Sequence, residues 1–340
     1  MGRFIIRRLV QAIPTLFGIT LFSYLLMLAA PGDPITMITF NPKSDPESTE
    51  RLRRQLGMDQ PPVVQYIYWL IGNDWVHIDV DGDGEGDVYG TRKGILRGDL
   101  GTSIQYKQPV WDVIMSRVGM TLRLTLTSLI IGYVVGIPIG VYSAVRKGSL
   151  FDQAARVLSV VGNAVPAFWL ARLWILLLAG HLRVRPAGGT RTLGADPNDL
   201  WDQAKYMIMP VIVLALGPIA GLSRFMRTET LEVLGQDYIR TARAKGLTDQ
   251  RVWWRHAVRN ALIPVATFLG PAIGGLIGGA VITEQIFSWP GMGRLIINAV
   301  FQRDYPLIMG DVFIGAVLFV LGLLLSDILY AWVDPRIRLS

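Results

Sequence analysis

The sequence contains no cysteine among its 340 residues. A disulfide framework, a thiolate metal site and a cysteine nucleophile are therefore excluded. The chain also lacks a Gly-x-x-x-x-Gly-Lys-Ser/Thr segment, the loop that cradles the phosphates of ATP in many ATPases. Its three histidines, His77, His181 and His256, lie in separate regions without the spacing of metal ligands. We find no catalytic set, and we expect any ATP that drives this chain to bind to another subunit.

Charged residues are also scarce. They make up 17% of the chain, against about 25% in soluble domains. Hydrophobic residues make up 51%, and the mean hydropathy is +0.39. This balance indicates a membrane protein. The formal net charge of +7 is, in so apolar a chain, more typical of cytoplasmic loops and contact with anionic membrane lipid than of nucleic-acid binding. We therefore expect no nucleic-acid partner.

Six long apolar runs predict an all-α integral membrane fold with six transmembrane helices, because about 20 apolar residues span a bilayer. The runs cover residues 9–30, 124–145, 157–182, 206–225, 261–282 and 308–332. The first run could instead be a signal peptide, but its apolar core is longer than the roughly 7–15 residues of such signals. Arg3, Arg7 and Arg8 precede it and favour a cytoplasmic N-terminus. Six spans then place the C-terminus in the cytoplasm too.

Polar segments divide the chain into three parts. Residues 1–30 form a tail and the first helix, residues 31–115 form an extracytoplasmic segment, and residues 116–340 form a core of five helices. Within the extracytoplasmic segment, residues 47–55 are predicted to be helical. Residues 63–70 form a second, aromatic and amphipathic stretch.

A basic segment, residues 235–264, lies between the fourth and fifth apolar runs and is therefore predicted to be cytoplasmic. Its sequence predicts a first helix that begins at Asp237 and ends at Gly246, because glycine suits the left-handed turn that closes a helix. Thr248 can cap a second helix with its hydroxyl. The segment therefore predicts a helix-turn-helix.

The second helix of this segment is predicted to have two different faces. Leu247 and Val252 have the spacing of a hydrophobic staple across its start. Residues four apart share one face of a helix. The basic face contains Arg251, Arg255 and Arg259, and the apolar face contains Trp253, Ala257 and Ala261. We expect the basic face to contact one partner and the apolar face to contact a second.

An acidic loop, residues 79–87, reads DVDGDGEGD and follows the calcium-loop pattern D-x-D-x-D-G-x-x-D. In such loops alternating oxygen ligands converge on one Ca²⁺ ion, and glycine permits the sharp turn. The side-chain ligands would be Asp79, Asp81, Asp83 and Asp87, and Glu85 would offer its backbone carbonyl. Gly90 occupies the place of the usual bidentate glutamate, so we expect weak binding. A solvated acidic turn is the alternative.

Three further features lie within the predicted spans. Gly270, Gly274 and Gly278 recur every four residues, a spacing that lets helices approach closely in lipid. Arg172 and Asp327 are charged residues inside apolar runs. Such residues line a transport pathway, pair with a partner subunit or make a polar contact between helices, and the sequence leaves these possibilities open.

Several motifs occur in an order that resembles a known family. They read RRLVQAIPTLFGIT, APGDP, RLRRQLGMDQPPVVQYIYWL, GDLGTSI, DYIRTARAKGL, RHAVRNALIP, EQIFSWPGMGRLI, RDYPL and DPRIR. Across nearly its whole length the chain resembles the first-type membrane permease of the dipeptide, oligopeptide and nickel ABC importers. These are binding-protein-dependent type I importers with the MetI-like permease fold. The acidic loop 79–87 is an insertion relative to the family pattern.

The resemblance implies that segment 235–264 docks onto an ATPase subunit. The residues it assigns to this coupling role are Asp237, Arg240, Ala242, Arg243, Gly246, Arg251 and Arg255. The chain departs from the general Glu-Ala-Ala pattern of such loops, because Arg240, Thr241 and Ala242 stand there. Pro264 also lies five residues further from Gly246 than the general pattern has it. Both departures are usual in the peptide branch of the family.

The resemblance also implies a set of partners in the cell membrane. They are a second, homologous permease subunit, two ABC ATPase subunits that bind ATP and Mg²⁺, and an extracytoplasmic solute-binding protein. The binding protein would dock on segments 31–115 and 283–307, the second of which is predicted to be an external loop. The implied cargo is a di- or oligopeptide, with nickel or another small solute as the alternative. A stand-alone secondary transporter or channel is the rival of a different class, but its spans would carry more charge.

Overall fold

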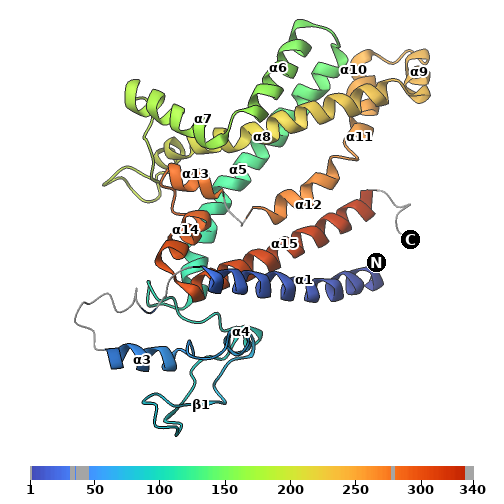
Figure 1. Ribbon diagram of the computed structural model, residues 1–340. Helices are drawn as coiled ribbons and strands as arrows, with labels where there is room; N and C mark the ends of the chain where they lie inside the picture. Colours follow the sequence, from blue (N-terminus) through green and yellow to red (C-terminus); the bar gives the residue numbers. More distant parts are fainter. Residues whose placement is uncertain (1, 31–34, 36–45, 277–279, 334–340) are drawn as a thin grey trace. The chain divides into compact units, whose positions relative to one another are not determined.

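The computed structural model describes residues 2–30, 35, 46–276 and 280–333, and these residues are mostly helical (Figure 1). The predicted all-α class is confirmed. In the described part the only strands are β1 (His77–Ile78) and β2 (Val88–Tyr89), which pair antiparallel. The chain forms two compact units. The first comprises Val118–Arg294 and Leu318–Ser340, and the second comprises Gly2–Arg117 and Leu295–Val317.

Four described helices are long and apolar enough to span a membrane. They are α1 (Gly2–Ala29), α5 (Val110–Val145), α8 (Leu200–Leu234) and α15 (Tyr305–Val333). They contain the predicted first, second, fourth and sixth spans, apart from Ala30 at the end of the first. Because α5 has 36 residues and a helix rises about 1.5 Å per residue, it exceeds the roughly 30 Å of a hydrocarbon core. Part of α5 is therefore expected to lie outside the hydrocarbon core.

The predicted third span is not a straight helix. Its region contains α6 (Leu150–Ala164), then α7 (Ala167–Trp174), which continues into the π-helical segment η2 (Ile175–His181). The two parts meet at 97°. Val165 is extended there (φ −76°, ψ 121°), because the ring of the following proline disfavours helical geometry in the residue before it. The prediction of one helix over 157–182 is therefore wrong, because the region contains two apolar helical parts with a sharp bend between them.

The predicted fifth span, 261–282, is also interrupted. It begins at the end of α11 (Val258–Ala261), continues as α12 (Ala266–Gly274), and reaches α13 (Val281–Ile286) after residues 277–279, which lie outside the described part. A proline at position 264 separates the first two helices, since it has no N–H to donate. A single continuous helix is therefore not found.

The region predicted as an external loop, 283–307, is largely helical. It holds most of α13, the whole of α14 (Met292–Gln302) and the start of α15. A short turn at Trp289 and Pro290 separates α13 from α14. The prediction of a loop is therefore wrong, because the proline and glycines that suggested it occupy only the turn between two helices.

In the second unit, α3 (Pro46–Gln55) confirms the helix predicted over 47–55, and the aromatic amphipathic stretch 63–70 is also a helix, α4 (Pro62–Ile71). Tyr66 of α4 is buried and contacts α1, where its ring lies 5.4 Å from the ring of Tyr24. Its hydroxyl lies 2.9 Å from the hydroxyl of Thr20. The short 3-10 turn η1 (Ile95–Arg97) packs near α4. Aromatic packing and this polar contact thus join α4 to the apolar helix α1.

In the first unit, α5 and α8 pack closely through glycines. A Cβ atom at Gly140 would lie 2.4 Å from the carbonyl oxygen of Ser223, and one at Gly132 would lie 2.6 Å from Cβ of Pro218. A Cβ at Gly136, between these two positions, would lie 3.1–3.2 Å from atoms of Ile219 and Leu222. No side chain fits between the two backbones here. This stripe at four-residue spacing therefore sets the contact between the two helices.

Candidate functional site: the basic helical pair and its supports

The basic segment forms two helical pieces at the end of α8 (Figure 1). They are α9 (Asp237–Ala244) and a second piece made of α10 (Asp249–Arg251), the π-helical η3 (Val252–Ala257) and α11. Gly246 joins them in the left-handed conformation (φ +77°), and its N–H donates to the Arg243 carbonyl at 2.9 Å. The predicted helix-turn-helix is confirmed. Thr248 stands at the predicted cap position but its side chain makes no capping hydrogen bond, so that detail is wrong.

The apolar face of the segment is covered by the segment itself. Ile239, Ala242, Val252 and Ala257 are buried together, and Leu247, Trp253 and the end of α8 pack around them. The expectation that this face is offered to a partner is therefore wrong. Ala242, to which the resemblance assigns a coupling role, belongs to this core. The apolar residues instead hold α9 against the second helical piece.

The basic side chains remain on the outside. Arg240 lies 3.3 Å from Asp237, and Arg243 lies 3.5 Å from Asp249. These pairs are exposed, and exposed pairs contribute little stability. Arg251, Arg255 and Arg259 are also exposed and make no ion pair within the described residues. The segment is thus an internally packed helical pair that presents the unpaired guanidinium groups of Arg251, Arg255 and Arg259 to solvent.

A buried ion pair anchors α8 near this segment. Asp152, at the start of α6, is 1% exposed and accepts hydrogen bonds from Nε (2.6 Å) and Nη2 (2.9 Å) of Arg227. It also accepts from the Gly148 N–H (2.9 Å) and from the Ser143 hydroxyl. Arg227 lies in the last two turns of α8. The pair therefore ties α8 to the turn between α5 and α6. Sequence reasoning missed it, although an arginine in an apolar helix was a signal.

A second buried carboxylate, Glu284 of α13, organises the motif EQIFSWPGMGRLI. Its Oε1 accepts from the Thr121 hydroxyl (2.8 Å), and its Oε2 accepts from the Arg294 N–H (3.0 Å). Burial raises the pKa of Glu284. The Thr121 hydroxyl accepts in turn from the Met292 N–H (2.7 Å). A Cβ at Gly291 would lie 2.5 Å from this carboxyl group, which explains a glycine there.

A third buried carboxylate, Asp304, organises the second unit. It joins the two motifs RDYPL and GDLGTSI, which lie about 200 residues apart. Its oxygens accept from the N–H groups of Ile104 (3.1 Å) and Gln105 (3.1 Å) and from the Ser103 hydroxyl. Its Oδ1 also accepts from the Leu307 N–H (3.3 Å) in the first turn of α15. The carboxylate thus caps α15 and holds a distant loop on it.

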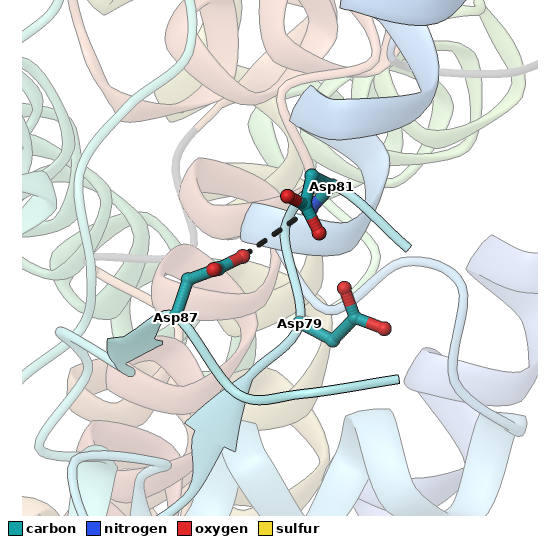
Figure 2. Close-up of side chains that lie close together, drawn as sticks. All are labelled: Asp79, Asp81 and Asp87. Atoms are coloured by element: carbon teal, nitrogen blue, oxygen red, sulfur yellow. Dashed lines mark hydrogen bonds between the residues drawn. The ribbon is translucent and has the colours of Figure 1, made fainter. Parts of the chain in front are cut away.

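The acidic loop brings together three of its four predicted aspartate ligands. Oxygens of Asp79, Asp81 and Asp87 lie within 4.8 Å of one another (Figure 2). Asp79 accepts from the N–H groups of Gly82 and Gly84, and these bonds lower its pKa. The carboxylate of Asp83 is not part of the group. It instead accepts from the N–H of Glu85 at 2.8 Å, so its predicted role as a ligand is not supported by the geometry.

Two of the three predicted packing glycines approach α15. A Cβ at Gly322 would lie 2.5 Å from Cα of Gly274 and 3.2 Å from the carbonyl oxygen of Gly270. Gly278 lies outside the described residues, and so does the side chain of Asp327, although its backbone belongs to α15. Arg172 of α7 is exposed and has no ion pair within the described part. The described residues thus give Arg172 no charged partner, and its role stays a prediction.

Several helices are long and apolar enough to cross a membrane, and the basic segment 235–264 lies in the sequence between two apolar helices, α8 and α12. This arrangement fits a membrane transport subunit. The chain belongs to the family of binding-protein-dependent transport system inner membrane components. That family matches residues 136–339, and the corresponding N-terminal family matches residues 1–125. The predicted resemblance is confirmed. The chain is accordingly a multi-pass inner-membrane permease subunit of an ABC importer rather than an enzyme, and the family implies ATPase and binding-protein partners.

Individual relatives cover almost the whole chain. It is 44% identical to the oligopeptide transport system permease protein AppB of Bacillus subtilis, over 99% of this chain and 100% of the relative. It is 39% identical to the dipeptide transport system permease protein DppB of Escherichia coli K12, over 99% of each. A solved structure of the MetNI methionine ABC transporter matches with a TM-score of 0.50 at 17% identity. It covers 65% of this chain and 96% of the matched one, which supports the MetI-like fold.

Proposed function

We propose that this chain is the permease through which an ABC importer moves di- and oligopeptides, and that segment 235–264 receives the movement of the ATPase. The names of relatives at 36–44% identity, which are dipeptide, di/tripeptide and oligopeptide permeases, support the cargo. The observation that carries the coupling role is the internally packed helical pair with its exposed arginines, joined directly to α8. ATP and Mg²⁺ bind to two partner ATPase subunits in this proposal.

The proposal places both termini and segment 235–264 in the cytoplasm, since Arg3, Arg7 and Arg8 flank the first span. A second, homologous permease completes the translocation path. The solute-binding protein docks on the second unit, where Asp304 fixes the loop of residues 102–109 onto the start of α15. Such a rigid surface suits repeated docking because little order has to be created on binding.

The coupling role is tested in the assembled importer. The variant Arg243→Glu/Gly246→Pro reverses an exposed charge and forces φ of residue 246 to about −65°, where the native turn has +77°. We expect ATP-dependent uptake of labelled tripeptide into vesicles to be lost, while the variant chain still inserts. The matched control, Arg191→Glu, changes an exposed arginine in the segment between η2 and α8 and keeps uptake.

Three results would contradict parts of this proposal. Normal uptake by the double variant would overturn the coupling role. If the wild-type importer takes up nickel but no peptide, the proposed peptide cargo is wrong and nickel is the cargo. Transport by the purified chain alone, without ATPase subunits, would overturn the importer function and favour a secondary transporter.

We also propose a weak Ca²⁺ site at the acidic loop 79–87. Three converging carboxylates supply the hard oxygen ligands that Ca²⁺ prefers, and the five acidic residues of the loop repel one another without a cation. The ligands are Asp79, Asp81 and Asp87. Such a site would stabilise the tip that follows β1 and precedes β2, and transport does not depend on it.

A further inference from the structure

A cavity of about 570 Å³ lies between three helices of the first unit. Leu129 and Tyr133 of α5, Gly221 and Phe225 of α8, and Phe268 of α12 contribute to its wall. Cavities that hold small molecules in proteins have volumes of about 300–1,000 Å³. The space is therefore large enough for a short peptide.

The wall of this cavity contains charges of both signs. Arg224 and Glu229 of α8 line it together with Thr228. Neither charged side chain makes an ion pair within the described residues. Both lie at or beyond the end of the predicted span 206–225, on the side of segment 235–264. Both side chains are therefore available to a molecule in the cavity that carries charge of both signs.

The rest of the wall is apolar and aromatic. The rings of Phe225 and Phe268 meet edge to face with centroids 4.8 Å apart. Tyr133 and Leu129 extend this surface along α5. Apolar walls discriminate weakly between side chains, since one methylene changes binding by only about 1–3 kcal/mol. A cavity with two fixed charges and such a wall suits molecules that share charged ends but differ in their side chains.

We propose that this cavity is a segment of the translocation path and that it holds a zwitterionic peptide. Arg224 faces the C-terminal carboxylate of the cargo, and Glu229 faces its N-terminal ammonium group. The inference rests on the proposed peptide cargo and adds the residues that contact it. Both charges lie in the last third of α8, the helix that leads into segment 235–264, so movement of that segment reaches the cavity directly.

The first test fills the cavity. Gly221 and Gly217 are both glycines of α8, and a Cβ at either position meets no atom within 4 Å. Only Gly221 lines the cavity. We expect Gly221→Met to lose peptide uptake in the reconstituted importer while the ATPase activity of the assembly remains. Gly217→Met is the matched control and keeps uptake. Equal uptake by the two variants overturns the inference.

The second test changes the charge. Arg224→Gln is expected to lower peptide uptake several-fold, and Arg224→Lys to restore most of it because the charge is kept. Glu229→Gln is expected to lower uptake in the same way. Glu232→Gln removes an exposed charge of α8 outside the cavity and leaves uptake unchanged. If Arg224→Gln and Glu229→Gln take up peptide as fast as the wild type, these residues do not contact the cargo and the assignment is overturned. If the wild-type importer moves no peptide at all, the proposed function fails instead.

Discussion

Glu284 and Asp79 are both carboxylates that accept backbone hydrogen bonds, but their surroundings differ. Glu284 is fully buried, and protein groups donate to both of its oxygens. Asp79 lies in an exposed loop, near two other carboxylates. Their pKa values move in opposite directions: burial raises that of Glu284, and the amides of Gly82 and Gly84 lower that of Asp79.

The difference separates two uses of negative charge in one chain. Asp152, Glu284 and Asp304 hold distant segments together, and their donors come from the protein. The loop carboxylates organise only their own turn and keep lone pairs for an external cation. Removal of a buried carboxylate should therefore damage the fold, and removal of a loop carboxylate should change only ion binding. Three substitutions test this contrast.

The largest effect is expected for Asp152→Ala. The change leaves the Arg227 guanidinium without its bidentate partner, and breaking a buried pair in this way costs about 3–5 kcal/mol. We expect a lower midpoint of heat denaturation in detergent and a smaller yield of assembled importer. The exposed carboxylate Glu232 serves as control, since Glu232→Ala should change stability by less than about 0.5 kcal/mol.

A double variant shows whether the uncompensated charge is the cause. Asp152→Ala/Arg227→Met removes both charges and should recover part of the lost stability, because apolar replacements of buried pairs are often neutral or better. If the double variant is as unstable as Asp152→Ala alone, the loss comes from packing and the contrast with the exposed loop weakens.

A smaller effect is expected for Glu284→Gln. The side chain keeps its size, but an amide has one acceptor oxygen where the carboxylate has two, so either the Thr121 O–H or the Arg294 N–H loses its acceptor. One unsatisfied buried donor costs about 1–3 kcal/mol. The midpoint of heat denaturation should fall by less than for Asp152→Ala, and Gln285→Glu, a neighbouring change in the same helix, is the matched control. An unchanged midpoint would mean that α13 is held by its apolar contacts alone.

Sequence patterns predicted the helices better than the polar contacts that join them. α1, α8 and α15 follow from the length of their apolar runs. The partners of Glu284 and Asp304 do not, because Thr121 is 163 residues from Glu284 and Ser103 is 201 residues from Asp304. Composition and spacing carry no information at that distance. The only sequence signal for these carboxylates is that they lie in the motifs EQIFSWPGMGRLI and RDYPL, which carry the resemblance to the family.

Two other features had signals in the sequence that were not used. Gly132, Gly136 and Gly140 repeat the four-residue spacing that singled out Gly270 and Gly274, and they pack α5 against α8. Pro166 stands at the 97° bend between α6 and α7, where its ring makes a break the expected outcome. The free arginines of segment 235–264 were predicted, but the internal burial of its apolar face required the structure.

The smallest effect on the fold is expected for Asp81→Asn, which removes one of the three converging loop carboxylates. Calorimetric titration of the purified chain at pH 7 should show Ca²⁺ binding with a Kd of about 10⁻⁴–10⁻³ M, the range of extracellular modules. Asp81→Asn should weaken it while the midpoint of heat denaturation without Ca²⁺ stays unchanged. Asp83→Asn is the matched control, because its carboxylate lies outside the group and binds the N–H of Glu85. Equal loss of binding in both variants would mean that the overall charge of the loop attracts Ca²⁺. If the wild type gives no heat of binding, the proposed Ca²⁺ site is wrong. The absence of heat would also show that the carboxylates of this loop serve only their own backbone, which would narrow the contrast with Glu284 to burial alone.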